Sequence, residues 1–312
     1  MPKAFDPNNP QKYLIDSGLS AALEVALDLG MPLLITGEPG TGKTQLAHYV
    51  AKKMDCTLQE FYTKTTSKAR DLFYKYNALT HFRDSQQQGA GVNSMHYISF
   101  ECLGQAILDS PHKRSVVLID EIDKAPRDFP NDVLFEFAQL AFKVQEAGVK
   151  ESADWAKEQK LSIKPDTQGY FRFEPESGQR PILILTSNSE KNLPDAFLRR
   201  CVYYHIPFPQ PERLAEIVTQ NLSISPDFQA KMLDHAIKYF MGIRQNHGLR
   251  KKPATAELLA WIHILQHKEF DLSRELNEIE AKEAIEKELT NTLSVLTKNR
   301  EDRERIIESL QR

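Results

Sequence analysis

The residues best suited to chemistry lie at positions 37–44, which read Gly-Glu-Pro-Gly-Thr-Gly-Lys-Thr directly after the apolar run 33–35. This spacing matches G-x-x-x-x-G-K-[ST], a phosphate-binding loop between a buried strand and a helix. Glycines let the backbone turn its N–H groups onto an anion, and a helix beginning at Lys43 turns its positive end toward the same anion. Lys43 can reach the β- and γ-phosphates of a nucleoside triphosphate, and the Thr44 hydroxyl can hold magnesium. The predicted phosphate-binding residues are Gly37, Glu38, Pro39, Gly40, Thr41, Gly42, Lys43 and Thr44.

A second chemical signal is the segment 115–121, Ser-Val-Val-Leu-Ile-Asp-Glu. Apolar residues followed by two acids predict a buried parallel strand that ends at a polar site. Ligands of open α/β sheets bind at the carboxyl ends of the strands. Asp120 is therefore expected to bind magnesium, directly or through water, and Glu121 to polarise the attacking water as a general base.

A third strand is predicted at 182–186, leading into Asn188. A side-chain amide at a strand end beside the γ-phosphate can orient the lytic water. The alternative is an asparagine that only forms a turn.

Two arginines, Arg199 and Arg200, precede the strand-like segment 201–206. An arginine placed before an edge strand can act as a finger that reaches the nucleotide of a neighbouring subunit. The alternative is a surface salt bridge.

Several elements must position these groups. Apolar spacing over 19–27 predicts a helix capped by Asp16 or Ser17, and 58–62 reads as a strand. Three prolines within 207–211 indicate a hinge. Helical periodicity follows at 214–218, 258–265, 272–279 and 289–296.

Two polar segments interrupt this pattern. Residues 61–83 interleave aromatic and basic side chains, which suits substrate engagement, single-stranded nucleic acid or plain packing. Residues 145–180 read as a long loop with a short aromatic run at 170–173. Loops of this length within a domain are usually functional or mobile.

Composition limits the class of protein. The chain has 312 residues, enough for about two domains, and its formal net charge of −3 provides no global basic field for nucleic acid. The sequence has no run of 18 apolar residues, so no membrane span is predicted. The first residues lack the apolar core of a signal peptide. Three scattered cysteines indicate reduced thiols in a cytoplasmic protein.

These motifs carry a family resemblance. Residues 37–44, 118–126, 186–188 and 193–201 resemble the Walker A, Walker B, sensor 1 and arginine-finger motifs of AAA+ ATPases. Within AAA+, the chain is most similar to the MoxR family, through 120–126 and the tail segments 249–261 and 296–302.

The resemblance implies a fold: an α/β P-loop AAA+ domain with a parallel five-stranded sheet sandwiched by helices, followed by a smaller all-α lid. The expected boundaries are 1–207 for the nucleotide-binding domain and 208–312 for the lid. A helix 2 insert is expected at about 64–95 and a pre-sensor 1 insert at about 145–180. The family's strand order, 5-1-4-3-2, puts the Walker A strand in the centre, between the neighbour of the Walker B strand and the finger strand.

The resemblance also implies ligands and partners. Tyr13, Leu14 and Ile15 would hold adenine, and Lys252 would serve as sensor 2, with Arg250 as the alternative. The cofactors would be ATP and Mg²⁺. A finger supplied in trans implies a homo-oligomeric ring, expected to be a hexamer, acting on a protein client with a von Willebrand factor A domain partner.

Two rival functions stay open at this point. One is a nucleic-acid motor or loader related to GTP-dependent restriction translocases, against which the net charge counts. The other is a nucleotide-gated switch in a bacterial conflict system, against which the predicted catalytic pair of Glu121 and Asn188 counts.

Overall fold

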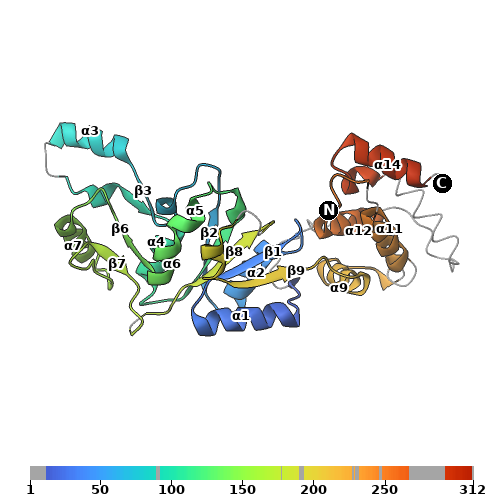
Figure 1. Ribbon diagram of the computed structural model, residues 1–312, viewed down its shortest axis with the longest axis horizontal. Helices are drawn as coiled ribbons and strands as arrows, with labels where there is room; N and C mark the ends of the chain where they lie inside the picture. Colours follow the sequence, from blue (N-terminus) through green and yellow to red (C-terminus); the bar gives the residue numbers. More distant parts are fainter. Residues whose placement is uncertain are drawn as a thin grey trace. The chain divides into compact units, whose positions relative to one another are not determined.

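The computed structural model describes residues 12–88, 92–176, 178–189, 193–226, 228, 232–245, 248–266 and 292–310. Contacts divide the chain into two compact units. The sheet unit comprises Ile15–Gly37 and Lys43–Ile206, and the helical unit comprises Met1–Leu14, Glu38–Gly42 and Pro207–Arg312. Figure 1 shows both units, which are described separately below.

The sheet unit is built on five parallel strands of the described chain, in the order β2-β5-β8-β1-β9. The inner strands β1, β5 and β8 are almost wholly buried, as expected of a parallel sheet covered on both faces. This order is the predicted 5-1-4-3-2, so the fold prediction is confirmed. The central strand is nevertheless β8 and not β1, because only the edge strand β9 lies beyond β1. The bounds are β1 Leu33–Gly37, β2 Thr57–Tyr62, β5 Ser115–Asp120, β8 Ile182–Ser187 and β9 Val202–Ile206.

Helices α1 (Ser17–Leu29), α2 (Lys43–Lys53) and α4 (Cys102–Asp109) pack on this sheet. Asp16 caps α1 as predicted, since its carboxylate accepts the Leu19 N–H at 2.8 Å. Gly30 ends α1 in the left-handed region, at φ 61°. Figure 1 shows α1 beneath β9, the strand that it contacts.

The two predicted inserts are more ordered than the sequence suggested. The first holds strand β3 (Tyr74–Tyr76) and helix α3 (Ala78–Gln88), and β3 pairs antiparallel with β4 (Ile98–Phe100), just beyond the expected end of the insert. The prediction of one long loop over 145–180 is wrong, because helix α7 (Val149–Glu158) occupies part of it. The apolar face of α7 buries Ala156 and packs Trp155 against the core, a signal hidden among polar residues. The aromatic run at 170–173 supplies β7 (Tyr170–Arg172), which pairs with β6 (Ala141–Lys143).

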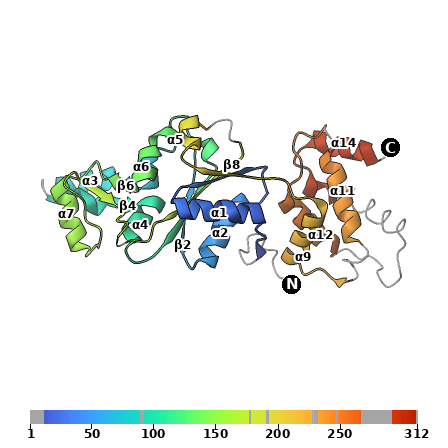
Figure 2. The same ribbon diagram turned by 60° about the horizontal axis from the view of Figure 1, so that its bottom comes forward.

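The two inserts pack on one another at one end of the sheet unit, where α3 and α7 lie in both views (Figures 1 and 2). Phe142 stacks on Phe73 and on Phe171, each at 5.4 Å between ring centroids, and Phe100 contacts Trp155 at 5.3 Å. Phe73 and Tyr74, within the aromatic–basic stretch, are core residues. Of the three interpretations of that stretch, packing therefore holds for these two side chains.

Short elements complete the sheet unit. They are the 3₁₀ helices η2 (Ala69–Leu72), η3 (Ser94–Tyr97) and η4 (Ile122–Lys124), and the helices α5 (Phe129–Asp132), α6 (Leu134–Gln139) and α8 (Asp195–Leu198).

The helical unit has a core of its own around Phe240 and Trp261. Its described helices are α9 (Pro211–Asn221), α11 (Leu233–Gln245), α12 (Thr255–Gln266) and α14 (Arg300–Leu310). The sequence analysis missed α11 and α14, although α11 buries Leu233, Ala236, Ile237, Phe240 and Ile243 at helical spacing. The helix predicted at 272–279 lies outside the described residues. Among the described helices, none is long and apolar enough to cross a membrane.

Candidate functional site

The polar residues predicted at three strand ends meet at the carboxyl edge of the sheet. Strands β1, β8 and β5 are neighbours, so the groups that follow them come together. The Lys43 ammonium donates to the Gly37 carbonyl at 2.8 Å and to Asn188 Oδ1 at 3.0 Å. The structure thus brings Lys43 and Asn188 together across two strands, with the lysine side chain buried.

The residues proposed to hold magnesium also contact one another. Thr44 Oγ1 donates to Asp120 Oδ1 at 3.0 Å. A hydroxyl and a carboxylate are hard oxygen ligands, and Mg²⁺ is usually held by one or two such groups together with phosphate oxygens and water. Within the described chain no group of three or more His, Cys, Asp or Glu side chains is arranged to hold a metal. Thr44 and Asp120 would together offer two such oxygen ligands to a magnesium ion that arrives with a phosphate.

A third residue, Thr186 on β8, holds the acidic strand end in place. Its hydroxyl donates to Asp120 Oδ1 at 2.5 Å and accepts the Glu121 N–H at 2.9 Å. Thr186 is fully buried, so its hydroxyl group has few alternative partners. Sequence reasoning used Thr186 as a strand residue and as part of the segment 186–188 that resembles sensor 1, but gave its side chain no role.

Glu121 takes an unusual backbone conformation, at φ 55° and ψ 50° in the left-handed region. Such a conformation is uncommon outside glycine and often marks a functional residue. The turn ends β5 and starts η4, where Lys124 donates to Glu121 Oε2. This hydrogen bond to Glu121 is the main cause that raises the pKa of Lys124. Asp123 accepts the Asn188 N–H at 3.2 Å, which ties the turn after β5 to the segment after β8.

The phosphate-binding loop itself depends on its glycines. Gly37, Gly40 and Gly42 have φ of 153°, 76° and 88°, conformations that other residues rarely adopt. Residues Glu38–Gly42 belong to the helical unit. There a Cβ at Gly40 would stand 2.5 Å from the Ala254 Cβ, and one at Gly42 would stand 3.0 Å from the Tyr13 ring. The space around the loop therefore excludes a side chain at Gly40 and leaves little room for one at Gly42.

The adenine and sensor 2 predictions fall on residues of different units. Tyr13 and Leu14 lie in the helical unit, where the Leu14 carbonyl accepts from Arg213 at 3.1 Å, and Ile15 lies in the sheet unit. Lys252 is exposed just before α12, and Arg250 pairs with Glu301 at 3.0 Å. Their neighbours Ala254 and Thr255 are the residues of this segment that approach Gly40. Arg244, which the sequence analysis did not select, contacts Glu38 of the loop.

Arg199 and Arg200 lie at the amino ends of the strands, on the side of the sheet opposite the carboxyl ends that carry Lys43 and Asp120. They precede β9, beside Met31 and Pro32 before β1 and Arg180 before β8, so they stand at the amino ends of parallel strands. A five-residue strand spans roughly 17 Å, so the two edges are well separated. Neither arginine is therefore placed to serve the site at the carboxyl edge of its own sheet.

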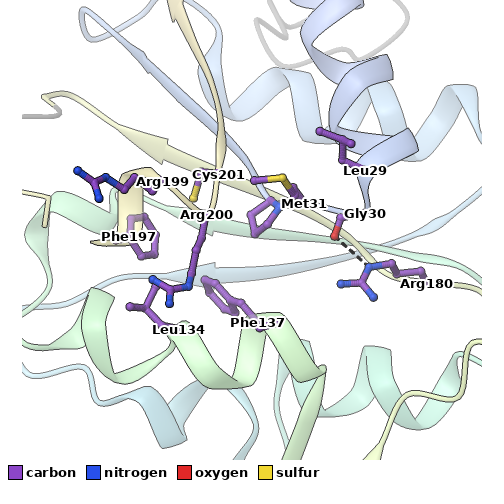
Figure 3. A pocket seen from close by; sticks show the side chains of 12 residues that line it. Leu29, Gly30, Met31, Leu134, Phe137, Arg180, Phe197, Arg199, Arg200 and Cys201 are labelled. Carbon is purple, nitrogen blue, oxygen red and sulfur yellow. Dashed lines mark hydrogen bonds between the residues drawn. The ribbon is translucent and has the colours of Figure 1, made fainter. Parts of the chain in front are cut away.

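These arginines border a pocket of about 300 Å³ with largely apolar walls. In Figure 3 the Arg200 side chain points toward Leu134 and Phe137, while that of Arg199 points away from the pocket. Arg200, two residues beyond the end of α8, donates to the carbonyl of Ala196 in that helix at 2.8 Å. Arg180 approaches from the other side, held by its bond to the Gly30 carbonyl at 3.0 Å.

Comparison with known proteins gives one family. Residues 32–201 match the profile described as AAA domain (dynein-related subfamily). Among solved structures, the chain is similar to a point mutant of Thermotoga maritima RuvB, with 17% identity and a TM-score of 0.44 over 91% of this chain and 73% of that chain. It is also similar to the structure titled Thermotoga maritima RuvB Holliday junction branch migration motor, with 15% identity and a TM-score of 0.42 over 86% and 66%. No curated protein matches the sequence significantly.

Proposed function

Since the chain belongs to the dynein-related AAA domain family, we propose that it is a magnesium-dependent ATPase. The observation that carries this proposal is the meeting of Lys43, Thr44, Asp120 and Asn188 at one edge of the sheet, through side-chain bonds of 3.0 Å. A cation, a hydroxyl, a carboxylate and an amide in this arrangement suit cleavage of a γ-phosphate by water.

Each residue has a distinct proposed role. Lys43 and the loop 37–44 bind the phosphates, and Glu121 accepts the proton of the attacking water while Asn188 orients it. Thr44 and Asp120 hold magnesium, which when bound neutralises charge on the phosphate oxygens. Tyr13, Leu14 and Ile15 are proposed to hold adenine, and Lys252 remains the proposed sensor 2.

We propose that the active form is a homo-oligomeric ring, a hexamer by family resemblance, in which Arg200 completes the site of a neighbour and Arg199 is its substitute. Both arginines lie at the amino ends of the strands, whereas the proposed nucleotide-binding residues lie at the carboxyl ends. This placement supports a role in trans. The proposed domain division is 1–207 for the nucleotide-binding domain and 208–312 for the lid.

The proposed cellular role is that of a MoxR-like ATPase that remodels or chaperones a protein client together with a von Willebrand factor A domain partner. This rests on the resemblance of residues 120–126 and the two tail segments. All three cysteines are free thiols, which suits the reducing cytoplasm.

The ATPase proposal is tested by phosphate release from magnesium-ATP by the purified protein, comparing wild type with Lys43→Ala. Loss of the lysine removes its charge from the phosphate site, so both the affinity for nucleotide and the rate of phosphate release should fall. The matched control is Lys53→Ala, ten residues further along the same helix, which should retain wild-type turnover. Equal activity in Lys43→Ala and wild type would remove Lys43 from the site.

A further inference from the structure

Arg244 lies near the carboxyl end of α11. It is a buried cation that contacts Glu38 of the phosphate-binding loop. Only 6% of the residue is exposed. Its guanidinium lies over the Phe208 ring, 3.3 Å from the centroid, and one terminal nitrogen, Nη1, donates to the Pro253 carbonyl. The other, Nη2, donates to Glu38 Oε2 at 2.5 Å.

All of these partners belong to the helical unit. The ring and the carbonyl fix the direction of the guanidinium, so its second nitrogen is aimed at the loop before any ligand arrives. The segment beyond Pro253 supports the same loop, because Ala254 lies directly against Gly40. Arg244 is therefore part of a preorganised support for residues 38–42 and not a mobile surface side chain.

Glu38 presents an electrostatic difficulty for a phosphate-binding loop. It places a carboxylate at the second position of the segment 37–44, where a polyphosphate would bring several negative charges. Like charges at close range disfavour binding, and a paired cation removes most of that penalty. Glu38 is about half exposed, so the pair is only partly desolvated and its effect is moderate.

We propose that Arg244 is a positioning residue of the nucleotide site: it neutralises Glu38 and ties the phosphate-binding loop to α11. This inference rests on the proposed nucleotide-binding function. Arg244 acts through Glu38 and not by direct contact with phosphate, since both of its terminal nitrogens already have partners.

The test combines two readouts on Arg244→Ala, on Glu38→Ala, which removes the hydrogen-bond acceptor, on Glu38→Gln, which removes only the charge, and on the double variant Arg244→Ala/Glu38→Gln. The first readout is amide hydrogen exchange of Gly40, Thr41 and Gly42 in nucleotide-free protein. Loss of the tie should speed exchange by about three- to tenfold in Arg244→Ala and in Glu38→Ala, whereas Glu38→Gln, whose amide oxygen can still accept from Arg244, should keep most of the protection. The control is Arg300→Ala, which removes an exposed arginine of the same unit whose ion pair with Glu304 lies on α14. It should leave exchange at the loop unchanged.

The second readout is the Kd for N-methylanthraniloyl-ADP with magnesium. Arg244→Ala should weaken binding by about tenfold, because the Glu38 carboxylate then lacks its buried cation. Adding Glu38→Gln to Arg244→Ala should recover a large part of that loss, because the carboxylate charge is then gone. A double variant that binds no better than Arg244→Ala would overturn the charge role and indicate direct contact with phosphate.

Two further results distinguish a failure of the Arg244 inference from a failure of the proposed nucleotide-binding function. Glu38→Ala changes a half-exposed side chain and leaves the core of the helical unit intact, so it reports on the tie even if Arg244→Ala unfolds. Wild-type exchange at the loop in Glu38→Ala would overturn the tie. If wild-type protein binds no nucleotide, the proposed function fails, whereas the exchange comparison still decides whether Arg244 holds the loop.

Discussion

The hydroxyl of Thr186 bridges the two acids of the candidate site, donating to Asp120 Oδ1 at 2.5 Å and accepting the Glu121 N–H at 2.9 Å. The same Asp120 oxygen accepts the Thr44 hydroxyl at 3.0 Å. A buried residue on β8 therefore orients the proposed magnesium ligand and fixes the backbone that carries the proposed base. The geometry of the acidic pair depends on the neighbouring strand as well as on its own.

Thr186→Val tests this bridge, because valine keeps the shape of threonine and removes the hydroxyl. Two hydrogen bonds, one of them to a carboxylate, would be lost. We expect turnover of magnesium-ATP to fall by about 10–100-fold, with a raised magnesium requirement. The measurement is phosphate release at varied magnesium concentration.

The control for Thr186→Val is Thr36→Val on the adjacent strand β1. Thr36 is equally buried, but its hydroxyl contacts Tyr203 and His205 and not the acids. The two variants should show similar thermal stability but different turnover. Equal turnover in both would mean that the Thr186 hydroxyl serves only the packing of the sheet.

Glu121→Gln should separate binding from chemistry. The amide keeps the shape of the side chain but cannot accept a proton from water. We expect magnesium-ATP to remain bound while turnover drops by about 10²–10⁴-fold, the usual loss for a general base. Single-turnover phosphate release and nucleotide titration measure the two effects separately. Wild-type turnover in Glu121→Gln would assign the base to another residue.

The cysteines should differ in reactivity. Burial raises the pKa of Cys102 and that of Cys201 to about 12, so very little thiolate is present at pH 8. Cys56 is more accessible than the other two cysteines. Partial burial, the largest influence on the pKa of its thiol, raises that pKa. N-ethylmaleimide at pH 8 should therefore label Cys56 first in native protein and all three after denaturation, as read by mass spectrometry. Early labelling of Cys201 would show that the pocket beside it opens in solution.

The sequence predicted the parts of the site that depend on motif spacing and strand ends. Lys43, Asp120 and Asn188 could be placed together because parallel strands deliver their carboxyl ends to one edge. The contacts of Thr186 and Arg244 could not be predicted in this way. Thr186 is one threonine within an apolar strand, and Arg244 meets Glu38 across 206 residues of sequence. Long-range pairs of this kind follow from packing, for which local periodicity carries no signal.

The same limit applies to the inserts. The aromatic–basic stretch suggested a binding surface, yet Phe73 and Tyr74 are buried: Phe73 stacks on Phe142, and the Tyr74 hydroxyl donates to Glu146. Helix α7 was missed because its apolar face is narrow and its surroundings are polar. Which aromatic residue faces solvent was decided by the contact between two segments that lie far apart in the sequence.

Arg200→Ala tests action across subunits. Arg200 stands at the amino edge of its own sheet, remote from Lys43 and Asp120, so its effect on hydrolysis should require a neighbour. We expect hydrolysis to fall by about 10³-fold or more while each subunit still binds ATP. In light scattering, magnesium-ATP should shift wild type, and more firmly Glu121→Gln, toward a ring of about six subunits.

The decisive experiment mixes Arg200→Ala with Glu121→Gln, each inactive alone. Arg200→Ala retains an intact base and Glu121→Gln retains an intact finger, so mixed rings contain some interfaces with both groups. Partial activity should therefore return on mixing, in proportion to the fraction of such interfaces. The control mixes Arg200→Ala with Arg200→Ala/Glu121→Gln, in which no subunit offers a finger and activity should stay absent. If mixed rings form and the first mixture also stays inactive, Arg200 does not act in trans, and Arg199 becomes the residue to substitute in the same design.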